Sequence, residues 1–302
     1  MTTLIFISLF PLIGLIVLGY VLKHKAFVDD YFWKGAEKIN YYLFFPAMLF
    51  LNLATAKVDV KAINNILMVL TIVVFIVVLF LYVIRKIIKI PSVRFGVYMQ
   101  SLVRFNTYIG LAVIASLFQQ KGMTIFAIIL VFGIPLVNVL SVLALTDSDH
   151  MKPKEILFSV VKNPLILGSV CGGIYNILGF GLWNGAEQFL KQLALCSLPL
   201  GLMCVGAALQ FKGLKEEFSS VVLNVLGRMI VVPSLAFIVC TLLNIPKLET
   251  QILILFFALP TASAAYILTK VLGGDYRLMA SIISMQTVCA AVTLPIILFK
   301  II

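Results

Sequence analysis

The sequence carries very little charge. Only 12% of its 302 residues are Asp, Glu, Lys or Arg, whereas 62% are hydrophobic. Soluble domains are nearer half apolar and a quarter charged, so a soluble core cannot hide this much apolar surface. The longest polar stretch, residues 146–155, is only a short connector. The composition therefore excludes a large soluble domain and predicts a chain whose solvent is lipid.

Catalytic and metal-binding patterns are also missing. The two histidines, His24 and His150, fall in expected loops, and the five cysteines lie inside apolar runs without paired ligand spacing. The aspartates lie in loops or at the ends of these runs, so no aspartate pair is available for intramembrane catalysis. No glycine-rich loop ending in Lys-Ser or Lys-Thr is present to cradle a nucleotide phosphate. We therefore expect no catalytic residue, metal or cofactor, and neither an enzyme nor a primary pump.

What the sequence has instead is a series of ten apolar runs of about 20 residues, the length that a helix needs to cross a bilayer. They predict an all-α, multi-pass membrane protein. The first run follows no basic residue and no obvious cleavage site, so we expect it to be a retained span. The runs are 3–22, 36–55, 63–84, 96–118, 123–146, 156–178, 187–209, 217–243, 249–272 and 277–300.

Positive charge is distributed unevenly between the loops. Of the basic residues, 13 fall in loops that share one side of the membrane and only five in the loops of the other side. Cytoplasmic loops are the Lys- and Arg-rich ones. We therefore predict that both termini lie outside the cell membrane. The same distribution accounts for the net charge of +11 without a nucleic-acid partner.

An internal repeat divides the chain. The pattern Trp-x-Gly-Ala-Glu occurs at 33–37 and again at 183–187, an offset of 150 residues. Pro11, Gly19 and Pro46 have counterparts 153 residues later. Each half contains five runs, and an odd number of crossings reverses direction, so the second half should be inverted, as is typical of secondary transporters. The expected repeats are residues 1–148 and 149–302.

Two runs are interrupted near mid-membrane. Residues 104–110 bring a cation, an amide and two hydroxyls into the fourth run, and residues 258–266 bring a proline and small hydroxyl residues into the ninth. Irregular backbone survives in hydrocarbon only where it is buried in protein or lines a cavity. We therefore expect each helix to break into halves, whose N-termini favour an anion. The simpler alternatives, a proline kink at Pro260 and an ordinary hydrogen bond from Asn106, remain open.

These residues resemble the auxin efflux carrier family in its short bacterial form. The resemblance rests on the run 104–110, Pro46 with Ala47 and Phe50, the run 206–209, and the segment 260–275, and it covers essentially the whole chain. It implies ten transmembrane helices in a 5+5 inverted repeat, with broken, crossing helices 4 and 9. It further implies a scaffold of helices 1, 2, 6 and 7 and a moving transport domain of helices 3–5 and 8–10.

The resemblance also implies a transporter of organic anions, with substrate bound where helices 4 and 9 cross. Polar residues of helices 5 and 10 lie at similar depth, although ordinary interhelical hydrogen bonding explains them equally well. For Arg104, capping of helix carbonyls is the alternative role. Arg228, inside the eighth run, should be buried, paired or snorkelling. The expected substrate-binding residues are Arg104, Asn106, Thr107, Pro260, Thr261, Ser263, Asn138 and Gln286.

The leading hypothesis is a secondary transporter that moves small carboxylates by an elevator-like, alternating-access mechanism. One alternative is a sodium-coupled organic anion symporter of the bile acid carrier type, which would share the crossed helices. Because no acid lies mid-span, an uncoupled or proton-linked process is favoured. A transport-like membrane receptor is the second alternative. The substrate, the direction of transport and a homodimeric state are left open.

Overall fold

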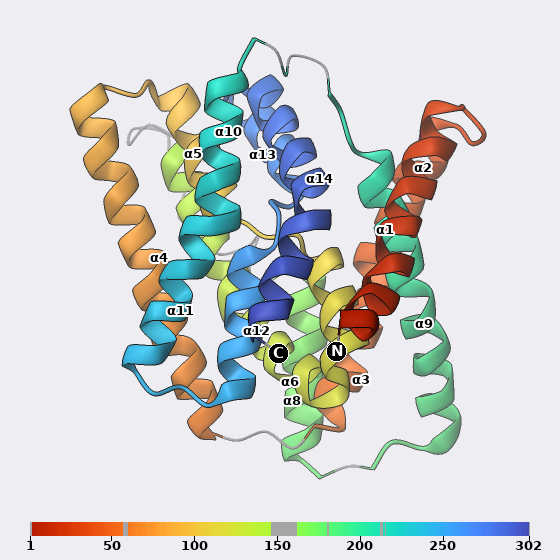
Figure 1. The fold of residues 1–302 in the computed structure, drawn as a ribbon. Coiled ribbons are helices and arrows are strands. Elements are labelled where there is room, and N and C mark those ends of the chain that lie inside the picture. Colours follow the sequence, from red (N-terminus) through yellow and green to blue (C-terminus); the bar gives the residue numbers. More distant parts are fainter. Residues whose placement is uncertain are drawn as a thin grey trace. The chain divides into compact units, whose positions relative to one another are not determined.

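The computed structural model describes residues 2–56, 60–145, 162–179, 181–211, 214 and 216–301. Within these residues the chain forms helices and no strands, which confirms the all-α prediction (Figure 1). The connector 146–155, His150, the repeat boundary at 148/149 and the start of the sixth run lie outside the described residues.

Long apolar helices dominate the described chain. Five of its helical stretches are long and apolar enough to cross a membrane by length and composition. One of them, Ser92–Leu145, covers two of the expected runs because it includes a break and a kink. The five stretches are Lys61–Ile88, Ser92–Leu145, Asn184–Ala207, Phe218–Leu242 and Tyr276–Ile301.

The chain folds into two compact units, each assembled from separate parts of the sequence. Unit 1 comprises Met1–Ile63, Leu111–Ile134 and Leu157–Ala208. Unit 2 comprises Asn64–Gly110, Pro135–Ile156 and Leu209–Ile302.

Glycines allow the helices of unit 1 to pack at backbone contact. Its helices are α1 (Thr2–His24), α2 (Asp30–Ile39), η1 (Asn40–Phe44), α3 (Phe45–Ala54), α8 (Pro164–Ile177) and α9 (Asn184–Ala207). Helix α1 packs along α9, and α3 along α8. A Cβ on Gly19 would lie 2.0 Å from the carbonyl oxygen of Met203, and one on Gly172 would lie 2.5 Å from that of Phe50. Small residues permit such an approach between membrane helices.

Both units contain a π-helical turn directly before a proline. In unit 1, η1 precedes Pro46 of α3, and the N–H of Phe45 reaches back to the carbonyl of Asn40. In unit 2, η3 (Gly227–Val231) precedes Pro233 of α11 (Val232–Leu242). Proline has no N–H and its ring clashes with the carbonyl four residues earlier, so a widened turn relieves the clash without ending the helix.

The core of unit 2 is apolar and comes from four helices. Val97 of α5 (Ser92–Val103), Val221 of α10 (Phe218–Leu226) and Ala265 of α13 (Ala264–Val271) pack with residues of α14 (Tyr276–Ile301). Unit 2 also contains α12 (Lys247–Ala258) and most of α4 (Val60–Ile88). The residues of α14 in this cluster are Leu278, Met279, Ile282 and Ile283.

Helix α6 (Thr107–Leu145) contains a sharp kink at Gln119. The backbone of Gln119 has φ 50° and ψ −147°, in the region that favours glycine. A non-glycine residue held there costs about 1–3 kcal/mol. The kink separates the ranges 96–118 and 123–146 that the sequence predicts as different spans, and residues Leu111–Ile134 around it belong to unit 1.

Arg228, in η3, is fully buried in unit 2. Its Nε donates to the carbonyl of Leu259 at 2.7 Å, and one terminal nitrogen donates to the carbonyl of Leu102 at 2.6 Å. The other donates to the carbonyl of Phe256 at 3.4 Å. These carbonyls lie at the C-terminal ends of α5 and α12, where a positive charge offsets the negative end of each helix dipole. The prediction that Arg228 is buried or paired is confirmed.

The first test concerns the glycine contact between α1 and α9. We expect Gly19→Ala to lower the unfolding temperature of the detergent-purified protein, because its added Cβ cannot fit against Met203. Overpacking of this kind costs about 1–3 kcal/mol. Gly14→Ala on the same helix is the matched control, since a Cβ there would meet nothing within 4 Å. Equal unfolding temperatures for the two variants would contradict the close packing.

The second test concerns Arg228. Arg228→Met should destabilise unit 2 by about 3 kcal/mol or more, because it leaves buried carbonyls without donors. Arg228→Lys, which keeps the charge but offers fewer directed donors, should lose less. The exposed Arg277 provides the control, as Arg277→Met removes a charge that is not buried. The unfolding temperatures of the three variants are measured in detergent. An Arg228→Met protein that unfolds at the wild-type temperature would show that the three hydrogen bonds of Arg228 do not stabilise the breaks.

Candidate functional site

Both predicted breaks are present, and in unit 2 they contact each other directly. Helix α5 ends at Val103 and α6 begins at Thr107, while α12 ends at Ala258 and α13 begins at Ala264. In the gaps, the backbone N–H of Asn106 donates to the carbonyl of Pro260 at 2.7 Å. The rings of Phe105 and Phe256 pack beside this bond, with centroids 4.4 Å apart. The two interruptions therefore form one structure.

Asn106 starts the second half of the fourth helix. Its side-chain oxygen accepts from the N–H groups of Tyr108 and Ile109, each at 3.1 Å. This is the usual N-cap arrangement, in which a side chain satisfies N–H groups that have no partner inside the helix. Only 3% of Asn106 is exposed. The break thus forms without a proline, because an asparagine supplies the cap.

Thr261 and Gln286 form a buried network behind the breaks. The N–H of Thr261 donates to the Gln286 side-chain oxygen at 2.9 Å, and its hydroxyl lies 2.9 Å from the carbonyl of Ser101 and 2.7 Å from the same glutamine oxygen. The Gln286 amide nitrogen lies 3.3 Å from the carbonyls of Ser101 and Asn224. Both side chains have no exposed surface. In this conformation they join α5, α10 and α14 to the break in the ninth run.

Arg104 lies at the end of α5 and is half-buried. Its guanidinium donates to the side-chain oxygen of Gln100 at 3.2 Å and to that of Asn138 at 3.1 Å. Gln100 in turn donates to the hydroxyl of Thr269 at 2.8 Å. The structure therefore brings Arg104 together with Asn138, 34 residues further along the chain.

The remaining predicted residues fall into two groups. Pro260 is buried and contributes its carbonyl to the contact with Asn106. Thr107 and Ser263 are half-buried at the starts of α6 and α13, and Ser263 makes no side-chain cap bond. The half-buried members of the predicted set are therefore Arg104, Thr107, Asn138 and Ser263.

Residues outside the predicted set also hold the helices around the breaks. Arg228 caps the first halves of both broken helices, as described above, while Ser101 donates to Asn224 at 2.5 Å and so joins α5 to α10. Gln100 orients Arg104. Of these residues only Arg228 gave a signal in the sequence, because an arginine inside an apolar run must find partners when it is buried.

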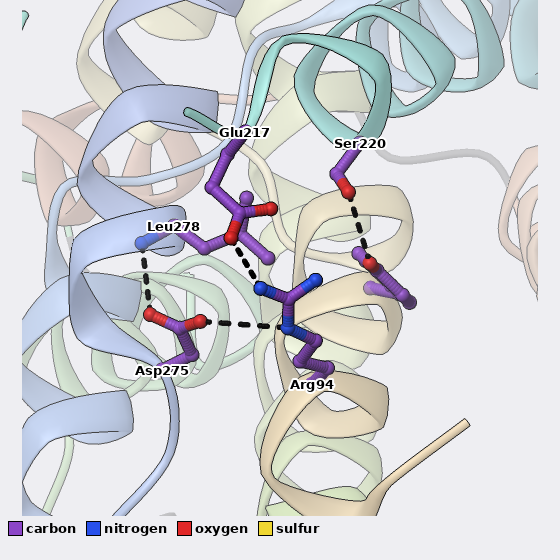
Figure 2. A network of polar contacts seen from close by, with 6 residues as sticks. Arg94, Glu217, Ser220, Asp275 and Leu278 are labelled. Atoms are coloured by element: carbon purple, nitrogen blue, oxygen red, sulfur yellow. Dashed lines mark hydrogen bonds and ion pairs between the residues drawn. The ribbon is translucent and has the colours of Figure 1, made fainter. Parts of the chain in front are cut away.

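An ion network lies at another end of the same helices (Figure 2). Arg94 of α5 contacts Glu217, which precedes α10, and its Nε lies 3.7 Å from Asp275, which precedes α14. Asp275 also accepts from the N–H of Leu278 at 3.1 Å, and Tyr98 donates to Ser220 at 3.3 Å. These contacts fix the relative positions of three helices of unit 2.

The chemistry available at the breaks suits an anion. Two helices, α6 and α13, begin there with the positive ends of their dipoles, and Arg104 adds a positive charge beside the amide of Asn138. Within the described residues, no group of three or more His, Cys, Asp and Glu side chains is arranged to hold a metal ion.

Comparison with known proteins identifies the family. The family model described as "Membrane transport protein" matches the chain twice, at residues 4–156 and 149–298. The chain is also 25% identical over 283 residues to an uncharacterized transporter of Methanocaldococcus jannaschii, covering 90% of this chain and 91% of that protein. With the apolar helices described above, these matches make it a multi-pass membrane protein. The chain belongs to the membrane transport protein family, that of the auxin efflux carriers.

Proposed function

We propose that the protein is a secondary transporter of small organic anions, which bind through a carboxylate at the paired breaks of unit 2. The observation that carries this proposal is the 2.7 Å hydrogen bond from Asn106 to Pro260, which joins two interrupted helices from different halves of the chain. Interrupted helices of this kind form the substrate sites of many secondary transporters.

The site offers three complementary contacts to a carboxylate. The guanidinium of Arg104 can pair with both carboxylate oxygens. The N-terminal turns of α6 and α13 add partial positive charge, and the hydroxyls of Thr107 and Ser263 are half-buried at those turns. In the structure, Arg104 donates to the side-chain oxygens of two neutral amides, Gln100 and Asn138, and in this proposal a carboxylate takes the place of one of them. In this proposal Thr261 and Gln286 do not contact the substrate. Their buried hydrogen bonds keep the backbone of the break in the ninth run in position.

Movement of unit 2 relative to unit 1 would supply alternating access. The buried bonds of Arg228, Thr261 and Gln286 all lie within unit 2, so this unit can carry the intact site as one body. Unit 1 contains α1, α3, α8 and α9, the elements of expected helices 1, 2, 6 and 7, together with Leu111–Ile134 from expected helices 4 and 5. The grouping of α1, α3, α8 and α9 supports an elevator-like mechanism in which these helices are the scaffold.

A 5+5 inverted repeat with crossing helices 4 and 9 underlies this proposal. The double match of the family model favours two related halves. The packing of α1 on α9 and of α3 on α8 is equivalent under the repeat, because Gly19 and Gly172 occupy matching positions in the two halves. An odd number of spans in each half then inverts the second half.

The third test concerns orientation. The basic-loop bias predicts Lys89 inside the cell and Lys121 outside. In a background without the five natural cysteines, Lys121→Cys should react with a membrane-impermeant maleimide on whole cells, whereas Lys89→Cys should react only after the membrane is opened. Labelling of both positions from the same side would contradict the inverted topology.

The fourth test concerns Arg104. Arg104→Lys keeps the charge but loses the planar fork, so we expect weaker carboxylate binding, and Arg104→Gln should lose about tenfold or more in affinity. A thermal-shift screen of a carboxylate panel identifies the ligand, and uptake into proteoliposomes measures transport. Arg277→Gln at an exposed position is the charge control. Wild-type binding by Arg104→Gln would overturn the proposed role of Arg104, as would failure of that variant to fold.

A further inference from the structure

Unit 1 contains a cavity that lies outside the proposed substrate site. Its volume is about 580 Å³, within the range of about 300–1,000 Å³ typical of small-molecule sites. Residues of α3, α6 and α9 line it, and all of them belong to unit 1. None of the residues at the breaks of unit 2 contributes to its wall.

The wall of this cavity combines apolar side chains with a few polar groups. Met48 and Met123 are among its apolar members, which outnumber the polar ones. The polar members are Asn52, Gln119, Gln120 and Lys191, so the lining holds a single ionisable side chain, and this side chain is a cation. Such a wall suits a ligand with an apolar body and one negative charge.

Backbone carbonyls hold two of the polar members, Asn52 and Gln120, in place. The Gln120 amide nitrogen donates to the backbone carbonyl of Asn52 at 3.1 Å, and Asn52 donates to the carbonyl of Met48 at 2.8 Å. These bonds join the kink of α6 to the last turns of α3. The left-handed conformation of Gln119 lies at this kink, so a strained residue forms part of the cavity wall. Strained positions of this kind are concentrated at ligand sites and switch regions.

The cation already has a carboxylate partner. The Lys191 ammonium lies 2.7 Å from a carboxylate oxygen of Glu187, one helical turn earlier on α9. Glu187 does not line the cavity, and 46% of the Lys191 side chain is exposed. An ion pair that is this exposed is weak, so an incoming carboxylate can compete with Glu187 for Lys191.

We propose that the cavity of unit 1 is a second anion-binding site, which takes a small carboxylate with an apolar body. Lys191 binds the carboxylate in exchange for Glu187, and the apolar part of the ligand packs against Met48 and Met123. The site shares no lining residue with the breaks of unit 2, so it does not depend on the role proposed for Arg104. Glu187 acts as a built-in competitor that sets the affinity of the site.

The exchange predicts opposite effects for two neighbouring substitutions. Lys191→Gln should weaken binding of 4-fluorobenzoate about fivefold, the most that a solvent-exposed charge pair usually contributes. Glu187→Gln should tighten it by a similar factor, because it releases Lys191. Binding is measured on the full chain in detergent by ¹⁹F NMR titration. The neutral analogue 4-fluorobenzyl alcohol should not distinguish the two variants.

Two controls make the outcome specific. Lys38→Gln removes an exposed unit 1 lysine that is not part of the cavity wall, and it should leave the affinity unchanged. Ala194→Trp, which places a large side chain in the cavity, should weaken this binding without altering the effect of Arg104→Gln on transport. Equal affinities for wild type and Lys191→Gln, or shifts of the same sign for the Lys191 and Glu187 variants, would overturn this site. Loss of transport in Arg104→Gln would still support the proposed function.

Discussion

A single buried guanidinium makes the two interrupted helices of unit 2 compatible with a membrane interior. Breaking a helix leaves carbonyls without partners, and in hydrocarbon each such group is costly. Arg228 bonds to carbonyls at the ends of both first halves, through Leu102 and Leu259. The Asn106 cap and the contact to Pro260 satisfy groups on the other side of the same gap. The irregular backbone therefore persists because one cation serves both breaks.

Burial separates the residues that shape the breaks from the polar residues that the proposed function assigns to the ligand. Thr261 and Gln286 are fully buried and bonded to each other, whereas Arg104 and Asn138 are half-buried. Hydrogen bonds from Arg228, Thr261 and Gln286 hold the backbone of the breaks. In the proposed function these bonds stay intact while Arg104 exchanges one of its amide partners for the substrate.

The sequence alone predicts much of this fold, for identifiable physical reasons. Apolar runs of membrane length predict the helices, and polar clusters at 104–110 and 258–266 locate both breaks, because such residues are expensive in lipid. The π-helical turns at 40–44 and 227–231 were not anticipated, since a proline signals a distortion without specifying its form. The partners of Arg228 were also not predictable, because they are backbone carbonyls distant in sequence.

The same limit applies to the candidate site. Residue type identified Arg104, Asn106 and Pro260, but burial separates Thr261 and Gln286 from the half-buried polar residues, and burial depends on tertiary packing. Arg104 and Asn138 are hydrogen-bonded although they are far apart in the sequence, and no periodic pattern in the sequence predicts that they meet. The sequence predicts a boundary between two spans at residues 119–122, but it does not predict that the chain passes this point as a kinked helix with a positive φ at Gln119.

The network of Arg94, Glu217 and Asp275 has a consequence for how unit 2 responds to its medium. These side chains are 37%, 26% and 26% exposed, so dissolved ions can reach them. At about 1 M salt the screening length falls to about 3 Å, and attraction between such groups largely disappears. The buried bonds around Arg228 are shielded from the same ions. Rising ionic strength should therefore fray the ends of α5, α10 and α14 first, while the middle of the unit stays intact.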